Sequence, residues 1–458
     1  MSSAATSGRS WAAWLAWMAL AFQALFAMTH FSNWLRPEYG GLAALLILVV
    51  AGGKRWRELA GHPLPWLVLA FIIYAVLQAA YAARLTPALS FAKHLSFNAE
   101  PIRVGVLTCV IGAWLAEWPR RIPLLLGLMV AGFVLAALVC TPWARLDEVV
   151  TGALRLRLRY AENIVGEYAA MGFLLLCLYA LSLSLRRRDR RTIAFAVMLV
   201  PAAALLLACL LYAQSRGAWL AAALVAPLAI FACLRNFHYH WRRPAGIALG
   251  LAIFAVIAAL GVGYAPVMHR LAGSEAVAAA LAHGELAELP SGSVTVRMQL
   301  AALGWHVWQT HPLLGIGLRN IQPAIVASGI HIGIYVPPHL HNAYLQALVG
   351  LGVIGAGLLL ATFMLLVREL WLARRANAAG SMLYWALLGC LGIMLIANIF
   401  DYLTWRFDYL RAPLELLLGS CFALSLHHRR RRGHETGDQT GAMTTGAASA
   451  IRGLESPR

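Results

Sequence analysis

The sequence is poor in charged residues, and the few it has are mostly arginines. Only 12% of its 458 residues are charged, with 19 acidic residues against 37 basic ones and just two lysines, Lys54 and Lys93. A soluble chain of this length would form two or three domains with polar surfaces, and too little polar material is present to cover them. A nucleic-acid-binding protein would carry far more charge, and a disordered chain would contain fewer large apolar residues. These classes are therefore excluded, and nucleic acid is not expected as a partner.

The sequence also lacks the motifs that mark common metal and redox sites. Its seven cysteines lie in or beside apolar runs, and none belongs to a C-x-x-C pair, so neither a zinc ribbon nor a dithiol redox site is supported. No H-E-x-x-H and no Asp-x-Asp motif occurs. The long hydrophilic segments contain no cysteine, so they need no disulfides in an oxidising compartment. No metal and no cofactor are predicted.

Long apolar runs are what the sequence has in abundance. Hydrophobic residues make up 61% of the chain, and a membrane-spanning helix needs about 20 of them in succession. The fold class predicted is therefore an all-α polytopic membrane protein. Twelve stretches qualify as spanning helices, near 11–32, 38–53, 64–83, 101–118, 122–140, 163–185, 192–213, 217–234, 244–264, 343–367, 381–400 and 408–426.

The arginines predict how these helices cross the membrane. A basic cluster follows every even-numbered stretch, from Lys54, Arg55 and Arg57 after the second to 429–432 after the twelfth. Positive charge marks cytoplasmic loops, so both termini are expected inside. The predicted organisation is nine helices in 1–264, a large outer loop in 265–342, three helices in 343–428 and a disordered basic cytoplasmic tail in 429–458.

The outer loop is too long to be a simple connector. Within it, Val296–Leu318 has the apolar spacing of a helix followed by a turn rich in proline and glycine. We expect this loop to contain helices and to pack on the membrane domain.

Several arginines fall on the outer face, against the positive-inside rule. Such charges pair with acidic residues, face a cavity or bind an anion, and the guanidinium group fits phosphate oxygens in a bidentate manner. Arg216 is the clearest case, because it lies in a very short turn before an apolar helix, whose N-terminus also favours anions. The alternatives are a snorkelling arginine and pairing with carboxylates or anionic lipid. The outer-face set comprises Arg155, Arg157, Arg159, Arg216, Arg270, Arg297, Arg319, Arg406 and Arg411.

A pair of histidines precedes the tenth apolar stretch. His339 and His341 follow two prolines, and in an extended segment their side chains would point the same way. Imidazole is the most frequent general base at neutral pH. A zinc site would need a third ligand, for which His331 is the nearby candidate, and a structural role at the membrane interface is a further alternative.

Three short motifs occur in a fixed order along the chain. They are Ser215-Arg216-Gly217-Ala218-Trp219, then His311-Pro312-Leu313-Leu314-Gly315-Ile316-Gly317, then His341-Asn342 with Gly352 and Gly355 beyond it. Together with the long outer loop, these motifs resemble the O-antigen ligase/polymerase superfamily. Ala356 departs from the pattern, which usually has Thr or Val at this position.

The resemblance implies a bacterial inner-membrane glycosyltransferase of the GT-C type, without a metal, whose active site faces the periplasm. The implied donor is an undecaprenyl-pyrophosphate-linked glycan, and in the ligase branch the acceptor is a sugar hydroxyl of lipid A–core, with inner-membrane lipids around the helices. His339 or His341 would act as the base in an inverting displacement, and Arg216 would stabilise the leaving pyrophosphate. The further residues predicted at the site are Arg157, Arg159 and Arg297 on the pyrophosphate and Glu162, Glu167 and Asn342 as orienting groups.

Three alternatives remain open from the sequence. An O-antigen polymerase and a protein O-oligosaccharyltransferase would share the chemistry and differ in the acceptor. A transporter or flippase would also suit twelve helices, although transporters usually place their charges near the bilayer midplane and in repeated halves.

Overall fold

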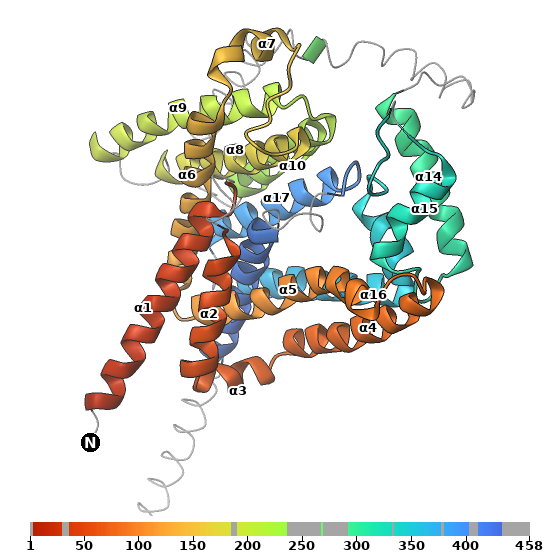
Figure 1. Ribbon diagram of the computed structural model, residues 1–458. Coiled ribbons are helices and arrows are strands. Elements are labelled where there is room, and N and C mark those ends of the chain that lie inside the picture. The colour runs from red at the N-terminus through yellow and green to blue at the C-terminus, as the bar shows by residue number, and fades with distance from the viewer. Residues whose placement is uncertain are drawn as a thin grey trace, which may run out of the picture.

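The computed structural model describes residues 3–29, 36–184, 190–235, 267–268, 292–331, 334–376, 380–402 and 411–432. Every element in these ranges is a helix (Figure 1). The first group of elements comprises α1 (Ser3–Phe26), α2 (Glu38–Ala51), α3 (Lys54–Ala60), α4 (Pro63–Leu85), α5 (Phe91–Leu115), η1 (Pro119–Arg121) and α6 (Ile122–Cys140). The second comprises η2 (Trp143–Arg145), α7 (Leu146–Thr151), α8 (Glu162–Ser184), α9 (Arg190–Tyr212), α10 (Arg216–Arg235), α14 (Ser293–Thr310), η4 (Leu318–Asn320), α15 (Ile321–Ser328), α16 (Ala343–Arg375) and α17 (Ser381–Ala397), followed by a helix over 411–432.

The observed helices agree with the apolar stretches predicted from the sequence. Each stretch coincides with a helix except 244–264, which lies outside the described residues. Of the predicted disordered tail, 429–432 are instead helical and continue the helix over 411–432, and the part from residue 433 onward lies outside the described residues. Five helices of the described ranges are long and apolar enough to cross a membrane. The all-α membrane fold is therefore confirmed, whereas the number of crossings stays a prediction.

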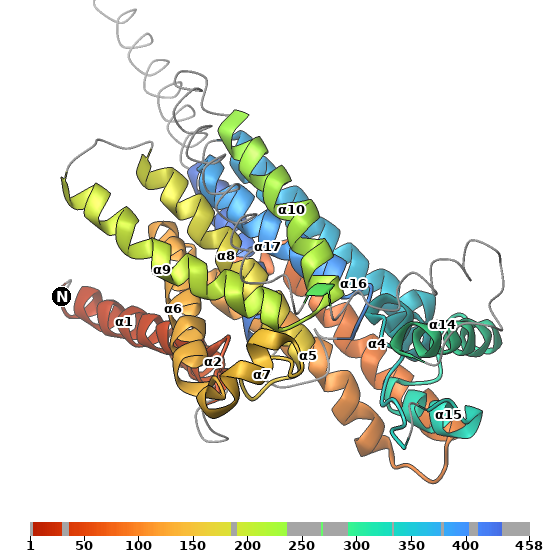
Figure 2. The same cartoon turned by 90° about the horizontal axis from the view of Figure 1, so that it is seen from above.

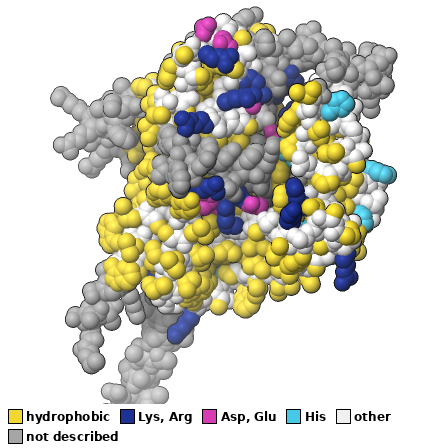
Figure 3. Space-filling view, in the orientation of Figure 1, with side chains coloured by type: hydrophobic (Ala, Val, Ile, Leu, Met, Phe, Trp, Pro, Cys, Tyr) yellow, Lys and Arg dark blue, Asp and Glu magenta, His cyan; other side chains and the backbone are white. Residues whose placement is uncertain are grey.

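The helices pack in groups that leave apolar side chains outside. Helix α8 contacts α9, α10 and α17, while α4 contacts α5 and α16, and α1 contacts α2 and α6. Figure 2 shows α8, α9, α10 and α17 running alongside one another, with α14 and α15 at one end of the bundle. Large residues such as Trp114, Phe133 and Tyr168 fill the interior. Apolar side chains also cover much of the exterior (Figure 3), as a lipid-facing surface requires.

Helix α16 is interrupted at Gly352, where the backbone takes φ 61° and ψ −176°. The polar backbone groups released by this break are paired with the motif segment 311–317. The two main chains form four hydrogen bonds: Ile316 N to Val349 O (2.9 Å), Gly317 N to Gly350 O (2.9 Å), Val353 N to Pro312 O (2.9 Å) and Ile354 N to Leu313 O (3.3 Å). Two of the three sequence motifs therefore form one structural unit.

The glycines of these motifs allow the close approach. A Cβ on Gly352 would overlap the carbonyl oxygen of Leu313, and a Cβ on Gly315 would lie 2.5 Å from the carbonyl oxygen of Val349. A Cβ on Gly355 would meet the ring of Tyr74 on α4 at 2.5 Å. The spacing Gly-x-x-Gly thus serves packing on both sides of α16.

Several helices begin or end at the same place. Leu156 N, in the loop before α8, donates to Tyr212 O at the end of α9 (2.9 Å), and Ala343 N at the start of α16 donates to Asn398 O after α17 (2.9 Å). Gly166 of α8 packs against Ser215, in the turn between α9 and α10, and against Ala218 of α10. We call this region the site end of the bundle, because the candidate functional residues gather there.

Candidate active site

His341 is held in a constrained position at the start of α16. The segment after Pro337 and Pro338 leads into this helix, and Asn342 caps it by accepting hydrogen bonds from Tyr344 N (3.0 Å) and Leu345 N (2.9 Å). His341 itself has φ 51°, a left-handed conformation that costs a residue other than glycine about 1–3 kcal/mol. The fold therefore fixes where this imidazole points.

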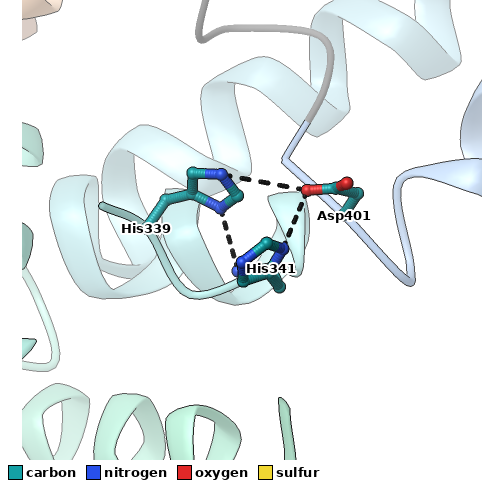
Figure 4. A group of neighbouring side chains, drawn as sticks. All are labelled: His339, His341 and Asp401. Carbon is teal, nitrogen blue, oxygen red and sulfur yellow. Dashed lines mark hydrogen bonds and ion pairs between the residues drawn. The ribbon is translucent and has the colours of Figure 1, made fainter. Parts of the chain in front are cut away.

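Asp401 joins the two histidines into one cluster (Figure 4). Its Oδ1 lies 3.0 Å from Nδ1 of His341 and 3.9 Å from Nε2 of His339. The two imidazole rings are stacked obliquely, with centroids 4.2 Å apart, and His341 N donates to Nδ1 of His339 at 3.2 Å. The predicted histidine pair thus has a buried carboxylate companion.

The hydrogen-bond partners of Asp401 keep it ionised. Burial alone would raise the pKa of this carboxyl, but the hydrogen bond from His341, the charge of both histidines and the amide of Asn163 together hold it below its ordinary value. Oδ1 also accepts from Tyr402 N at 2.8 Å. An ionised carboxylate can only accept, so Nδ1 of His341 carries the hydrogen and Nε2 of neutral His341 keeps a free lone pair.

The same hydrogen bonds argue against a metal at this cluster. Among the described residues, His339, His341 and Asp401 have potential ligand atoms within 4.8 Å of one another. However, Nδ1 of His339 accepts a backbone hydrogen bond, so in the neutral ring Nε2 carries the hydrogen and cannot ligate a cation. Nδ1 of His341 likewise donates to Asp401. These donors and acceptors fit a hydrogen-bonded acid–base cluster better than a cation site.

A polar cavity lies beside the cluster. It has a volume of about 410 Å³, and its lining includes His341, Asp401, Asn163, Arg216 and Arg297. Arg216 is the first residue of α10, and Arg297 lies on α14. Burial lowers the pKa of Arg297, opposed by the charge of Asp401, but arginine remains a cation under all working conditions. An imidazole and two guanidinium groups therefore share one cavity.

A larger apolar groove adjoins this cavity. Its volume is about 700 Å³, and it shares Ala301 and Asn342 with the polar cavity. Side chains of α4, α5, α14, α16, α17 and the helix over 411–432 line it, from Asn342 at the site end to Leu64 and Leu366. This groove can accommodate a long hydrocarbon chain whose polar end lies in the cavity.

The other predicted site residues lie around the cavity rather than in its wall. Arg157 is exposed and forms an ion pair with Glu162 at 2.8 Å, and Arg159 is exposed nearby with φ 65°. Glu167 is buried on α8, one turn after Asn163. His339 is only 2% exposed and lies behind His341. Of the residues predicted from sequence, His341, Arg216, Arg297 and Asn342 line the cavity together.

Three residues that were not among the predicted site residues complete the site. Asp401 orients His341, Asn163 donates to Oδ2 of Asp401, and Arg155 donates to Oδ1 of Asn163 at 3.1 Å. A signal for Asp401 existed, because the predicted topology places it at the same face as the histidines. Asn163 carried no such signal, since only tertiary contacts select it from other polar residues. Arg155 had been named only as one of the outer-face arginines, without a role at the site.

Comparisons with known proteins test whether the chain matches the family that its motifs resemble. The search of curated proteins gives no match. Residues 201–360 match the family model described as O-antigen ligase. The matched range contains all three sequence motifs together with Arg216, Arg297, His339 and His341, while Asn163 and Asp401 lie outside it. Residues 201–360 therefore form a segment of the O-antigen ligase family, as the three motifs indicated.

Proposed function

We propose that this protein is an O-antigen ligase, which transfers a glycan from undecaprenyl pyrophosphate to a sugar hydroxyl of lipid A–core. The family match supports glycosyl transfer of the ligase or polymerase type. The observation that carries the proposal is the cavity in which His341, oriented by Asp401, faces Arg216 and Arg297 beside an apolar groove.

His341 acts as the general base. Its Nε2 takes the proton of the acceptor hydroxyl while the hydroxyl oxygen attacks the anomeric carbon of the donor glycan, with inversion at that carbon. Asp401 accepts the hydrogen of Nδ1, so it fixes the tautomer and stabilises the imidazolium that forms. His339, which lies behind, supports the position of His341 through its hydrogen bond to the backbone.

Arg216 and Arg297 stabilise the leaving group. As the bond from the anomeric carbon to the phosphate oxygen breaks, negative charge develops on undecaprenyl pyrophosphate, and two guanidinium groups in a partly buried cavity stabilise it. Arg157 and Arg159 lie farther out and would attract the anionic donor before it reaches the cavity. Cationic side chains thus supply the stabilisation that a divalent cation supplies in many other transferases.

The apolar groove would bind the prenyl chain of the donor. Its walls are almost entirely apolar, and it reaches the polar cavity at Ala301 and Asn342. A prenyl chain in the groove would place its pyrophosphate beside Arg216. The basic clusters at the opposite helix ends favour an orientation with the site end in the periplasm and both termini in the cytoplasm.

A deletion strain distinguishes this function from that of a polymerase. Loss of all long-chain lipopolysaccharide, with accumulation of lipid-linked polymer, is the result expected for a ligase. Cores that carry a single repeat unit would instead identify a polymerase, and intact lipopolysaccharide with unglycosylated proteins would identify a protein O-oligosaccharyltransferase. Lipid-linked glycan that stays on the cytoplasmic side of the membrane would identify a flippase.

A further inference from the structure

Arg155 contacts both halves of the proposed active site without lining its cavity. We propose that Arg155 is a positioning residue that holds the turn carrying Arg216 and, through Asn163 and Asp401, the base His341. This inference rests on the proposed transfer reaction, because it assigns Arg155 a role in coupling the base to the leaving-group site.

One branch from Arg155 leads to the turn between α9 and α10. Its Nε donates to Ala213 O at 3.2 Å, and its Nη2 donates to Gln214 O at 3.3 Å. Gln214 has φ 50°, which a residue other than glycine adopts only when its surroundings hold it there. Its side chain is tied to Gly152 O at 2.9 Å. Arg155 therefore stabilises a constrained turn that ends directly at Arg216.

The other branch leads to the base. Nη2 of Arg155 also donates to Oδ1 of Asn163 at 3.1 Å, and this leaves the amide nitrogen of Asn163 directed at Oδ2 of Asp401. Asp401 in turn holds Nδ1 of His341 at 3.0 Å. The asparagine amide cannot rotate without losing both bonds, so Arg155 fixes which of its atoms faces the carboxylate.

The position of Arg155 differs from that of its neighbour Arg157. The side chain of Arg155 is 25% exposed and that of Arg157 is 69% exposed, although both approach Glu162. Nη1 of Arg155 lies 3.5 Å from Oε1 of Glu162, which balances part of its charge. The guanidinium group of Arg155 is thus held by hydrogen bonds within the protein, whereas that of Arg157 is exposed to solvent and accessible to substrate.

Only an arginine can make this set of contacts. The planar fork presents donors in fixed directions, so one side chain reaches two carbonyl oxygens, an amide oxygen and a carboxylate. A lysine at this position keeps the charge but offers a single ammonium group. The substitution Arg155→Lys therefore tests geometry while it leaves the electrostatic potential nearly unchanged.

The experiment is steady-state transfer by purified full-length protein from lipid-linked glycan to lipid A–core, with kcat and the donor KM measured separately. Asn163→Ala removes only the contact to the base, so it should lower kcat by about 10-fold or more and raise the donor KM less than Arg155→Lys does. Arg155→Lys removes the hydrogen bonds to the turn as well as the one to Asn163, so it should lower kcat by about 10- to 100-fold and also raise the donor KM. In the double variant, the kcat losses should not multiply, since the two residues act in one chain of contacts.

The control is Arg145→Gln in the same loop, where an exposed arginine pairs with Glu148 at 2.6 Å away from the cavity, and its kinetics should match the wild type. Wild-type kinetics in Arg155→Lys, or a loss of thermal stability with kcat and KM unchanged, would overturn the proposal. Absence of transfer by the wild-type protein would instead contradict the proposed function. If Arg155→Lys does not fold, Gln214→Ala replaces it as the probe of the turn: a raised donor KM supports the proposal, and an unchanged one overturns it.

Discussion

Nδ1 of His341 lies 3.0 Å from Oδ1 of Asp401, although the two residues are 60 positions apart in the chain. One precedes α16 and the other follows α17, so the fold brings them together only because both helices have these termini at the site end. The contact gives the two nitrogens of His341 different roles: Nδ1 donates to the carboxylate, and Nε2 is the nitrogen that would take the proton of the acceptor hydroxyl in the proposed reaction.

The first prediction concerns Asp401. Asp401→Asn keeps the shape of the side chain but permits the amide to donate to His341, which favours the wrong tautomer. We expect kcat to fall by about 10²- to 10⁴-fold with little change in the donor KM. An unchanged kcat in a folded Asp401→Asn protein would show that His341 needs no orienting partner.

The second prediction concerns pH. Because the pKa of Asp401 is lowered in the folded protein, its interactions stabilise the fold fully above about pH 4 and lose that effect as the pH falls further. The carboxylate therefore stays ionised wherever the protein works. Thermal unfolding in detergent should show a loss of stability below about pH 4, and Asp401→Asn, which has no carboxyl group to protonate, should lose less stability over the same pH range. An equal loss in both proteins would contradict the lowered pKa of Asp401.

The third prediction concerns the two arginines of the cavity. Arg216→Lys on α10 removes the bidentate guanidinium group but keeps a positive charge, and Arg297→Gln on α14 removes a positive charge. Each should lower kcat/KM by about 10- to 10³-fold in the transfer assay. If Arg216→Lys has wild-type kinetics, Arg216 is only an interfacial arginine with its charge directed at the headgroups.

The fourth prediction concerns the break in α16. Gly352→Ala places a Cβ against the carbonyl oxygen of Leu313 at a positive φ, so we expect a loss of at least about 1–3 kcal/mol in stability, measured by thermal unfolding in detergent. Gly357→Ala on the same helix is the matched control, because a Cβ there meets nothing within 4 Å. Equal unfolding temperatures for the two variants would contradict the described packing of segment 311–317.

The fifth prediction concerns the apolar groove. Ala347→Trp would fill part of its volume near the cavity, so the KM for a donor with a full-length prenyl chain should rise several-fold. A donor with a short prenyl chain should be affected much less. Leu228→Trp, at an exposed position of α10 outside the groove, is the control. An equal rise in KM for both donors would show that the prenyl chain binds outside this groove.

The sequence predicted most of the fold because membrane helices are specified locally. About 20 apolar residues in succession predict a helix whatever its neighbours are, and the basic residues between them predict its direction. Boundaries were less certain. The fourth stretch was predicted from residue 101, whereas α5 begins at Phe91, since Ser90 caps it there by accepting from Lys93 N.

The site was predicted only in part, because some of its residues lie in short sequence motifs and others are brought together only by tertiary contacts. Arg216 and the histidines lie in short motifs beside helix starts, so their chemistry was visible in the sequence. The partnership of Asp401, Asn163 and Arg155 depends on tertiary contacts between the loop before α8, the start of α8 and the loop after α17. The choice between His339 and His341 likewise needed the backbone of His341, whose positive φ no spacing rule predicts.

The most direct test of a metal-independent reaction with His341 as its base is glycan transfer by the purified protein in detergent, with lipid-linked glycan, lipid A–core and excess EDTA, and without any ion gradient. Such a reaction should proceed at the same rate with and without EDTA, with loss of about 10²-fold or more in His341→Ala and a smaller loss in His339→Ala. Transfer that EDTA abolishes, or that survives His341→Ala, would contradict a metal-independent reaction with His341 as its base.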